Sequence, residues 1–410
     1  MDIKKIDQLF AETAYVRMGG SEEELKCAEY LKAKCEELGM EAHLEEFEVS
    51  MSTMKHASLV VDGQEIPCKG YFGCGSGEIE APFYYLRADD AYSLSECKGK
   101  IVMVNGYMGF WLYRDIVKNG AVGFITYDGN ANYVDEDIDQ RELRDILKED
   151  TKVLLGVNIN AKKAIELVKN DAKTAKIVIE QDEYKGLSHN VVAYIPGEVD
   201  ETIVCTAHYD STSLSEGAYD NMSGSIGLLG IAEKFMSAPH KYGLTFVFCG
   251  SEERGLLGSK AYVEAHKDEL DKIVLNVNLD MIGCIMGHFL ACCTTEEKLV
   301  HFIEYFCKMQ GFDMKARQDV YSSDSTPFAD KGVPALSFCR WAPTNTATIH
   351  NSYDTAKVMS AVQMQKDIDF INAFVDVMAN AKTCPVAREI PENMKEKLDI
   401  YNCRKRDPKK

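Results

Sequence analysis

The chain has 410 residues, of which 46% are apolar and 27% charged, so it is long enough to build one large core or two domains. Its formal net charge of −19 argues against a nucleic-acid-binding protein, which needs a basic surface, and no apolar run is long enough to span a membrane. The 14 cysteines include no CxxC pair, and many lie within apolar runs, which is typical of free thiols in a reducing compartment. We therefore expect a cytoplasmic protein, or an exported one if a leader precedes this sequence.

The first fifty residues predict two helices and a strand. The apolar spacing over residues 1–20 predicts an amphipathic helix that lacks the apolar stretch and cleavage site of a signal peptide. A second helix is expected between Ser21 and Gly39, because Ser21 and Glu24 have the spacing of a capping box and glycine commonly ends a helix. The alternation of residues 41–50 then predicts a strand.

Residues 55–184 have a different sequence pattern, with short strand-like pieces, glycine-rich turns and a charged segment over 128–150. No histidine or paired-acid motif stands at a strand end there. We expect a compact β-rich insert, which divides one domain into two parts, residues 1–54 and 185–395. The remaining residues, 396–410, form a basic tail that is expected to be frayed or bound to the surface.

Beyond the insert, apolar strands alternate with helices. The strands are expected at ETIVCTAH, LTFVFCG, KIVLNVNLD and PALSF, each followed by a helical pattern. Near-continuous apolar strands in this alternation are typical of a sheet that is covered on both faces. The sequence therefore predicts the α/β class, with a mixed, mostly parallel sheet flanked by helices.

Polar side chains follow several of these strands, or directly precede a helix, at the point where each element ends or begins. They are His208 and Asp210 in TAHYD, Asp220 in GAYDN, Glu252 and Glu253 in CGSEE, Asp280 in NLDMIG, and His350 in TIHNSYDT. The carboxyl ends of the strands of an open α/β sheet line one crevice, so residues far apart in sequence can converge there.

Two imidazoles and three carboxylates form a ligand set that Zn²⁺ accepts. Five ligands exceed one tetrahedral site, but they suit two metal ions if one carboxylate bridges them. A further carboxylate is then needed to move protons, and one residue of the adjacent pair Glu252 and Glu253 could ligate while the other acts as this base. Taken alone, such a pair is typical of a solvated helix start.

A lone histidine is more often a structural residue than a ligand. We interpret the remaining candidates in this way; they are His43, His56, His240, His266 and His301.

These motifs together resemble the co-catalytic di-zinc aminopeptidases, a family that also includes glutamate carboxypeptidases, transferrin receptor and glutaminyl cyclases. The resemblance rests on TAHYDST, GAYDNMSGSIGLLGIAEKF, FVFCGSEERGLLGSKAYV, NLDMIG and IHNSYDT, and it covers the chain from about Asn190 to Val377. The insert resembles a protease-associated domain through LSECKGKIVMVNG, IVKNGAVGFITYD and VNINAKKAIELVKN.

The resemblance implies that two zinc ions bind per chain. It makes Asp220 the bridging carboxylate, gives one zinc to His208 and Asp280, and gives the other to Glu253 and His350. It also implies a cis peptide bond between Asp220 and Asn221.

The resemblance further implies that Glu252 is the general acid/base and that Asp210 orients the imidazole of His208. Tyr321 could stabilise an oxyanion or contact the substrate, although a packed loop tyrosine is an equal alternative. The segment YSSDSTPF departs from the family, because Ser325 stands where relatives often carry a histidine.

The expected function is that of a metallo-aminopeptidase acting on peptides with a free N-terminus. A di-zinc carboxypeptidase, dipeptidase or amide hydrolase is the main alternative, although DNMSGS favours the aminopeptidases. A glutaminyl cyclase would keep a single zinc, and a non-catalytic receptor-like relative would have lost ligands. The sequence leaves the oligomeric state open, a homodimer included.

Overall fold

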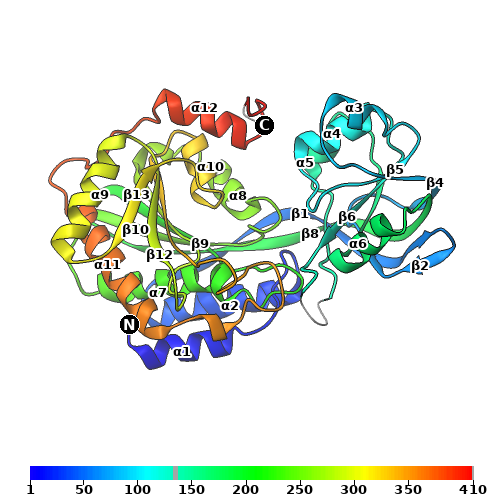
Figure 1. Ribbon diagram of the computed structural model, residues 1–410. Helices are drawn as coiled ribbons and strands as arrows, with labels where there is room; N and C mark the ends of the chain where they lie inside the picture. Colours follow the sequence, from blue (N-terminus) through cyan, green and yellow to red (C-terminus); the bar gives the residue numbers. More distant parts are fainter. Residues whose placement is uncertain (133–136, 409–410) are drawn as a thin grey trace. The chain divides into compact units, whose positions relative to one another are not determined.

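The computed structural model of the protein describes residues 1–132 and 137–408 (Figure 1). Contacts within the chain divide it into two units, which we name unit 1 and unit 2. Unit 1 consists of Met1–Phe47 and Leu187–Lys410, and unit 2 of Glu48–Gly186.

Two long strands carry the chain between the units. Strand β1 (Glu41–Val61) leads into unit 2, and β8 (Thr174–Ile195) leads back. The identity of unit 2 as a protease-associated domain, and the boundaries 55–184 expected for the insert, stay predictions from the sequence. Residues 133–136 of the expected charged segment and the last two residues of the tail lie outside the described residues.

Unit 1 is built on a mixed, mostly parallel sheet, which confirms the predicted fold class. Its strand order is β13-β12-β14-β11-β9-β10-β8, and neighbours run parallel except at β12–β14 and β10–β8. Besides β8, the strands are β9 (Val199–His208), β10 (Tyr242–Cys249), β11 (Ile273–Leu279), β12 (His288–Thr294), β13 (Met314–Gln318) and β14 (Ala335–Trp341).

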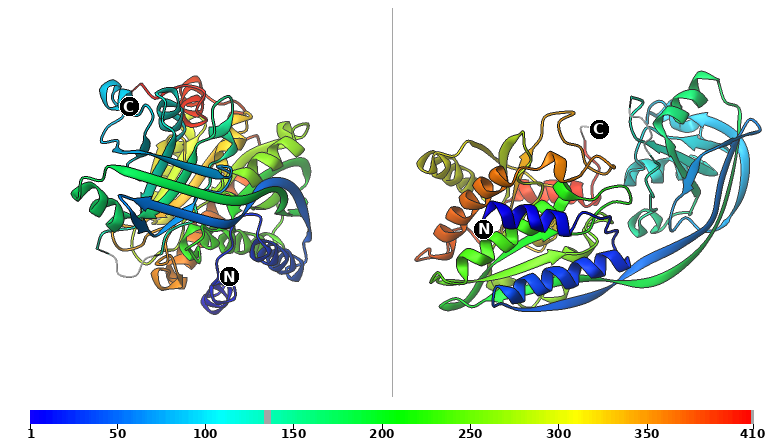
Figure 2. Two further views of the ribbon diagram at one scale, coloured as in Figure 1. Left: turned by 90° about the vertical axis from the view of Figure 1, so that its right-hand side faces the viewer. Right: turned by 90° about the horizontal axis from the view of Figure 1, so that it is seen from below.

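Helices cover both faces of this sheet (Figures 1 and 2). One face carries α1 (Ile3–Glu12), α2 (Glu22–Glu37), α7 (Ser223–Phe235), α9 (Glu297–Gln310) and α11 (Ala361–Ala379). The other carries α8 (Leu257–Ala265), α10 (Ser325–Asp330) and α12 (Glu392–Tyr401). Each face of the sheet has its own core, which we call the first core (with α1, α2, α7, α9 and α11) and the second core (with α8, α10 and α12). Successive side chains of a strand point to opposite faces, so Phe246 of β10 lies in the first core and Val247 in the second.

Short 3-10 turns complete unit 1 at Leu270–Lys272 and Ala356–Val358. Helix α12 includes the start of the expected tail, and its Met394 and Leu398 are buried in the second core. The predicted helix start at Ser21 is confirmed, because its side chain accepts a hydrogen bond from the N–H of Glu24.

Helix α7 packs unusually close to its neighbours because it contains glycines. A side chain at Gly224 would meet the carbonyl oxygen of Leu279 at 2.2 Å, and one at Gly230 would meet Ile368 at 2.8 Å. The glycines therefore bring the first turn of α7, and the residues just before it, next to the end of β11.

Unit 2 has its own hydrophobic core. Its strand order is β8-β4-β5-β6-β7-β3; β4 to β7 run parallel, and the outer pairs β8–β4 and β7–β3 are antiparallel. These strands are β3 (Cys68–Gly70), β4 (Gly77–Tyr85), β5 (Ile101–Met103), β6 (Gly123–Asp128) and β7 (Leu155–Asn160), with β2 (Gln64–Ile66) paired to β1. The helices are α3 (Ala91–Ser95), α4 (Phe110–Lys118), α5 (Asp145–Lys148) and α6 (Ala161–Lys169).

Candidate metal centre

Polar residues lie at or shortly after the ends of three neighbouring strands of unit 1, at the same edge of the sheet. Strand β9 ends at His208, β11 ends just before Asp280, and β10 ends three residues before Glu252. Because β10 and β11 both run parallel to β9 and flank it, their carboxyl ends lie side by side.

A fourth ligand candidate, Asp220, lies in an irregular turn (Ala218–Met222) directly before α7. The peptide bond from Asp220 to Asn221 is cis, as the family resemblance implies. The carboxylate of Asp354 accepts hydrogen bonds from the N–H of Tyr219 (2.8 Å) and of Asp220 (3.1 Å), and so holds this turn. Sequence reasoning missed Asp354, although it stands in the quoted motif TIHNSYDT.

Short distances connect the five predicted ligands. The two carboxylate oxygens of Asp220 lie 3.1 Å from Nε2 of His208 and 3.1 Å from Nε2 of His350. Glu253 Oε2 is also 3.1 Å from Nε2 of His350, and Asp280 Oδ1 is 3.8 Å from Nε2 of His208.

These residues form two groups that could each hold a metal ion. One consists of His208, Asp220 and Asp280 and the other of Asp220, Glu253 and His350, with the ligand atoms of each group within 4.8 Å of one another. Asp220 belongs to both groups.

Glu252 belongs to neither group but lies beside the first one, with Oε2 4.0 Å from Nε2 of His208. Asp210 supports this arrangement through three contacts. Its carboxylate accepts hydrogen bonds from the N–H of Glu252 (2.9 Å) and of Glu253 (3.1 Å), and its Oδ1 lies 3.3 Å from Nδ1 of His208. One buried carboxylate therefore contacts both the imidazole and the adjacent glutamates.

The cluster shifts the pKa of its members in both directions. Burial pushes the pKa of Asp220 up, but the contacts with His208 and His350 outweigh it and hold this pKa below its ordinary value. Burial raises the pKa of Glu252 well above its ordinary range; His208 opposes this shift, and the charge of Glu253 adds to it. Burial lowers the pKa of both imidazoles, yet the surrounding carboxylates raise them well above their ordinary values. Such shifts are typical of functional sites.

The donor set fits zinc. Imidazole nitrogen and carboxylate oxygen are ligands that Zn²⁺ accepts, and buried carboxylates are stabilised by pairing or by metal coordination. Asp280 is 4% exposed, and its Oδ1 has no hydrogen-bond partner among the described residues, so this atom is available to a cation.

A further carboxylate that sequence reasoning missed is Asp324. It is fully buried, and burial raises its pKa to about 7, with the negative charges of Asp280 and Asp210 adding to the shift. Its neighbour Ser325, at the position where relatives often carry histidine, is buried with its hydroxyl 2.8 Å from that of Ser337.

Tyr321 lies in a small apolar cluster rather than on an open surface. It is 7% exposed, packs with Leu290, Cys292 and Cys339, and its hydroxyl accepts a hydrogen bond from the indole N–H of Trp341 at 3.4 Å. Burial raises its pKa well above the ordinary value, and the charge of Asp280 adds to this.

The histidines interpreted as structural lie outside both ligand groups. His240 contacts the carbonyl oxygen of Tyr242 at 2.7 Å, and His266 contacts Glu45 at 2.9 Å.

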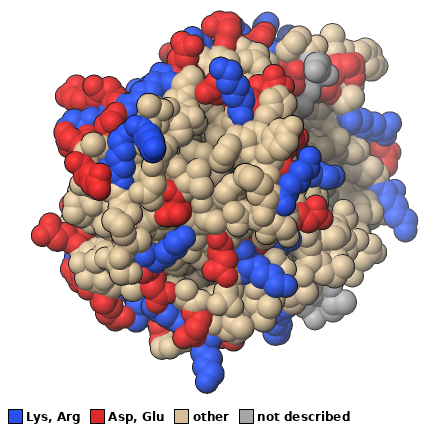
Figure 3. All heavy atoms as spheres, turned by 90° about the vertical axis from the view of Figure 1, so that its left-hand side faces the viewer, with Lys and Arg blue, Asp and Glu red and all other residues tan. Residues whose placement is uncertain are grey.

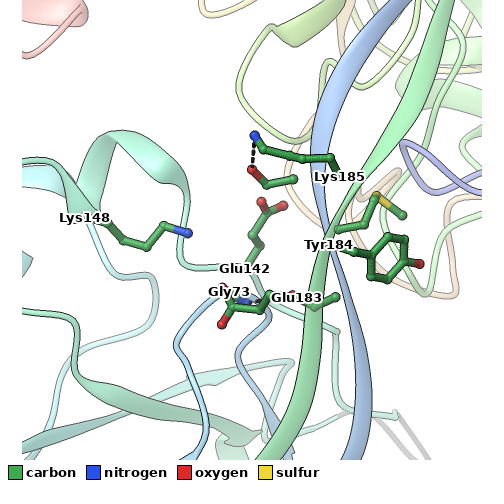
Figure 4. A pocket seen from close by; sticks show the side chains of 9 residues that line it. Gly73, Glu142, Lys148, Glu183, Tyr184 and Lys185 are labelled. Carbon is green, nitrogen blue, oxygen red and sulfur yellow. Dashed lines mark hydrogen bonds between the residues drawn. The ribbon is translucent and has the colours of Figure 1, made fainter.

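Unit 2 has a pocket of its own (Figure 4), lined by Ser50, Met51, Ser52, Gly73, Glu142, Lys148, Glu183, Tyr184 and Lys185. Its polar groups contact neighbours within the unit. Lys185 donates to the hydroxyl of Ser50, Lys148 pairs with Asp145, and Glu183 accepts from the N–H of Gly75. No metal-ligand group was found in the described part of unit 2.

On the face drawn in Figure 3, acidic and basic side chains are interspersed around an uncharged centre, and the basic ones do not form a continuous patch. Among the helices of residues 1–132 and 137–408, none combines the length and apolar composition that crossing a membrane requires.

Comparison with known proteins shows what the chain is similar to. The family model described as "Peptidase family M28" matches residues 190–375 of this chain. Aminopeptidase YwaD of Bacillus subtilis is 26% identical over 412 aligned residues, which cover 94% of this chain and 86% of the relative. Two solved structures share the fold: BSAP, a zinc aminopeptidase from Bacillus subtilis (TM-score 0.77, 22% identity, 96% of this chain and 98% of that chain), and a peptidase M28 precursor from Shewanella amazonensis (TM-score 0.76, 18% identity, 95% of each chain).

Proposed function

Because residues 190–375 match the description "Peptidase family M28", we propose that the chain is a zinc-dependent aminopeptidase that removes N-terminal residues from peptides, with two metal ions and a glutamate base. The observation that carries this proposal is the pair of ligand groups that share Asp220. One tetrahedral zinc site would not need five side chains. A shared carboxylate lets these five side chains serve two ions.

In this proposal His208, Asp280 and Asp220 would hold one zinc, and Glu253, His350 and Asp220 would hold the other. Such ions would supply Lewis-acid polarisation of the scissile carbonyl and would lower the pKa of a water nucleophile.

The chain's own residues position the substrate and move the proton. Glu252 is the proposed general base: it is a non-ligating carboxylate beside the ligand cluster, where it would accept a proton from water and return it to the leaving amine. Asp210 holds the backbone of Glu252 and the ring of His208 in one arrangement. The buried carboxylates favour a substrate that carries a free N-terminal ammonium group.

Cytoplasmic location stays a prediction from the sequence, and the oligomeric state stays open, a homodimer included.

Metal analysis combined with a substrate panel tests the proposal. The purified chain should bind two zinc ions and hydrolyse aminoacyl-nitroanilides, while the N-acetylated counterparts of the same substrates should react far more slowly. Equal hydrolysis of free and blocked substrates would point to an amide hydrolase or carboxypeptidase-like enzyme instead.

A further inference from the structure

One buried carboxylate of unit 1 takes no part in the proposed mechanism, although it lies directly behind the adjacent glutamates. It is Glu24, in the first turn of α2, and it is 1% exposed. We propose that Glu24 is a positioning residue, which holds Ser251 and thereby fixes the carboxylate of Glu252 for proton transfer. This inference rests on the aminopeptidase function proposed above.

The carboxylate of Glu24 contacts both the turn after β10 and the residue that precedes the cap of its own helix. Glu24 Oε1 accepts a hydrogen bond from the N–H of Ser251 at 2.8 Å, and the hydroxyls of Ser251 and Ser188 lie 3.1 Å and 2.9 Å from the same oxygen. Glu24 Oε2 accepts from the N–H of Gly20 at 2.6 Å. The capping box predicted for Ser21 and Glu24 is therefore only half formed, because the glutamate side chain bonds Gly20 and Ser251 in place of the Ser21 N–H.

Ser251 needs such a support because of its backbone conformation. Its φ of 53° lies in the left-handed region, which residues other than glycine rarely adopt and which surrounding contacts must stabilise. Glu24 accepts a hydrogen bond from the N–H of Ser251, and Asp210 accepts from the N–H of Glu252 and of Glu253. Three successive N–H groups of this turn are thus bound by two buried carboxylates.

The residues around this turn are packed so closely that added side-chain atoms would clash. A side chain at Gly19 would lie 2.4 Å from the Ser251 hydroxyl, and one at Gly250 would lie 2.9 Å from Glu24 Oε1. In the same N-terminal segment the Arg17 guanidinium donates to the carbonyl oxygen of Tyr209 at 2.7 Å. Residues 17–24 therefore contact the chain just after β9 and just after β10, two of the three strand ends that carry the site.

If Glu24 positions the base, its loss should reduce turnover and leave the metal ligands in place. We expect Glu24→Gln to lower kcat by about 10- to 100-fold, with KM changed by less than about twofold, since a small misplacement of a reacting group has effects of this size. The zinc content should equal that of the unchanged chain. The matched control is Glu23→Gln in the same helical turn, because Glu23 is exposed; it should leave kcat unchanged.

Hydrogen–deuterium exchange gives a readout that requires neither substrate nor metal. In both the zinc-loaded and the chelator-treated chain, amides of residues 246–259 should exchange faster in Glu24→Gln than in Glu23→Gln, because the N–H of Ser251 loses its carboxylate acceptor. If Glu24→Gln fails to fold, Ser188→Ala removes a single hydroxyl donor, and it should lower kcat by a few-fold at unchanged KM.

The positioning role would be overturned if folded Glu24→Gln had both the kcat and the hydrogen exchange of the wild-type protein. If Glu24→Gln does not fold, the same result in Ser188→Ala would overturn it. Loss of zinc as the main effect would also overturn it, because the role would then be ligand support. If the unchanged chain hydrolyses neither free nor blocked nitroanilides, the proposed function fails, and the exchange data still judge the contact between Glu24 and Ser251.

Discussion

The adjacent glutamates after β10 face different partners although they share one backbone support. Glu253 contacts His350, whereas Glu252 lies near His208 and belongs to no ligand group. Successive residues of a non-helical turn point in different directions, so two identical side chains can serve in two roles. We assign metal binding to Glu253 and proton transfer to Glu252.

Exchanging each glutamate for glutamine separates these roles. Glu252→Gln removes the proton acceptor but no proposed ligand, so turnover should fall by about 10²- to 10⁴-fold while the zinc content stays at the wild-type level. Glu253→Gln should lose the zinc held with His350. The measurements are kcat on an aminoacyl-nitroanilide and zinc content after dialysis.

The opposite pattern, with zinc lost from Glu252→Gln and retained by Glu253→Gln, would show that the two assignments are reversed.

At the level of single elements, strand β6 of unit 2 ends on a carboxylate that is costly to ionise. Asp128 Oδ2 accepts a hydrogen bond from the amide of Asn158 on β7 at 2.6 Å and lies 3.4 Å from the guanidinium of Arg141. Its Oδ1 is buried without a hydrogen-bond partner in the described structure. Burial raises the pKa of Asp128 to about 6 despite these contacts.

This shift predicts a pH dependence of stability with a definite sign. Below pH 3.8, the ordinary value for the unfolded chain, Asp128 is protonated in both states. As the pH rises to about 6 the unfolded state ionises first, so the native state loses stability, by up to about 3 kcal/mol. Asp128→Asn cannot ionise, and its free energy of unfolding should therefore exceed that of the wild type increasingly between pH 4 and about 6.

Denaturant titrations across this pH range, followed by the fluorescence of Trp111 in unit 2, measure the difference. Trp341→Phe as the background removes the second tryptophan of the chain. A difference between the two proteins that stays constant with pH would contradict the shifted pKa.

At the level of the whole molecule, the metal site belongs to one unit. The proposed ligands come from the ends of β9 and β11, the turns before α7 and after β10, and the loop that carries His350, all within Leu187–Lys410. Metal ions that together bind these segments would stabilise only the native state of unit 1.

Chelation of the metal should therefore weaken unit 1 selectively. At free zinc of about 1,000 times Kd, its removal costs about 4 kcal/mol of unfolding free energy. The unfolding of unit 1, followed by Trp341 fluorescence in Trp111→Phe, should shift to lower temperature, whereas the Trp111 signal in Trp341→Phe should not shift. Equal shifts of both signals would contradict a site confined to unit 1.

Much of this molecule is predictable from local patterns. The alternation of apolar strands with helices predicts the α/β class, since a buried parallel strand needs apolar residues on both faces. Polar residues at the ends of such strands are ambiguous one by one, but their occurrence together in chain order marks His208, Glu252 and Asp280 as site candidates. The order of strands in the sheet does not follow from these patterns.

Long-range contacts explain what the sequence patterns missed. Glu24 has the spacing of a helix cap, but its main partner is Ser251, 227 residues away. Asp354 supports Asp220 from 134 residues away, and Asp324 is buried near charges that come from other strands.

Residue types, their periodicity and their positions at element ends are properties of the chain alone, and they determine the fold class and the candidate ligands. The partner of each buried carboxylate depends on which strands lie next to each other. Only folding brings N–H groups of distant segments to within 3 Å of the carboxylates of Glu24, Asp210 and Asp354. Burial then makes these hydrogen bonds necessary, because an unpaired buried charge is costly.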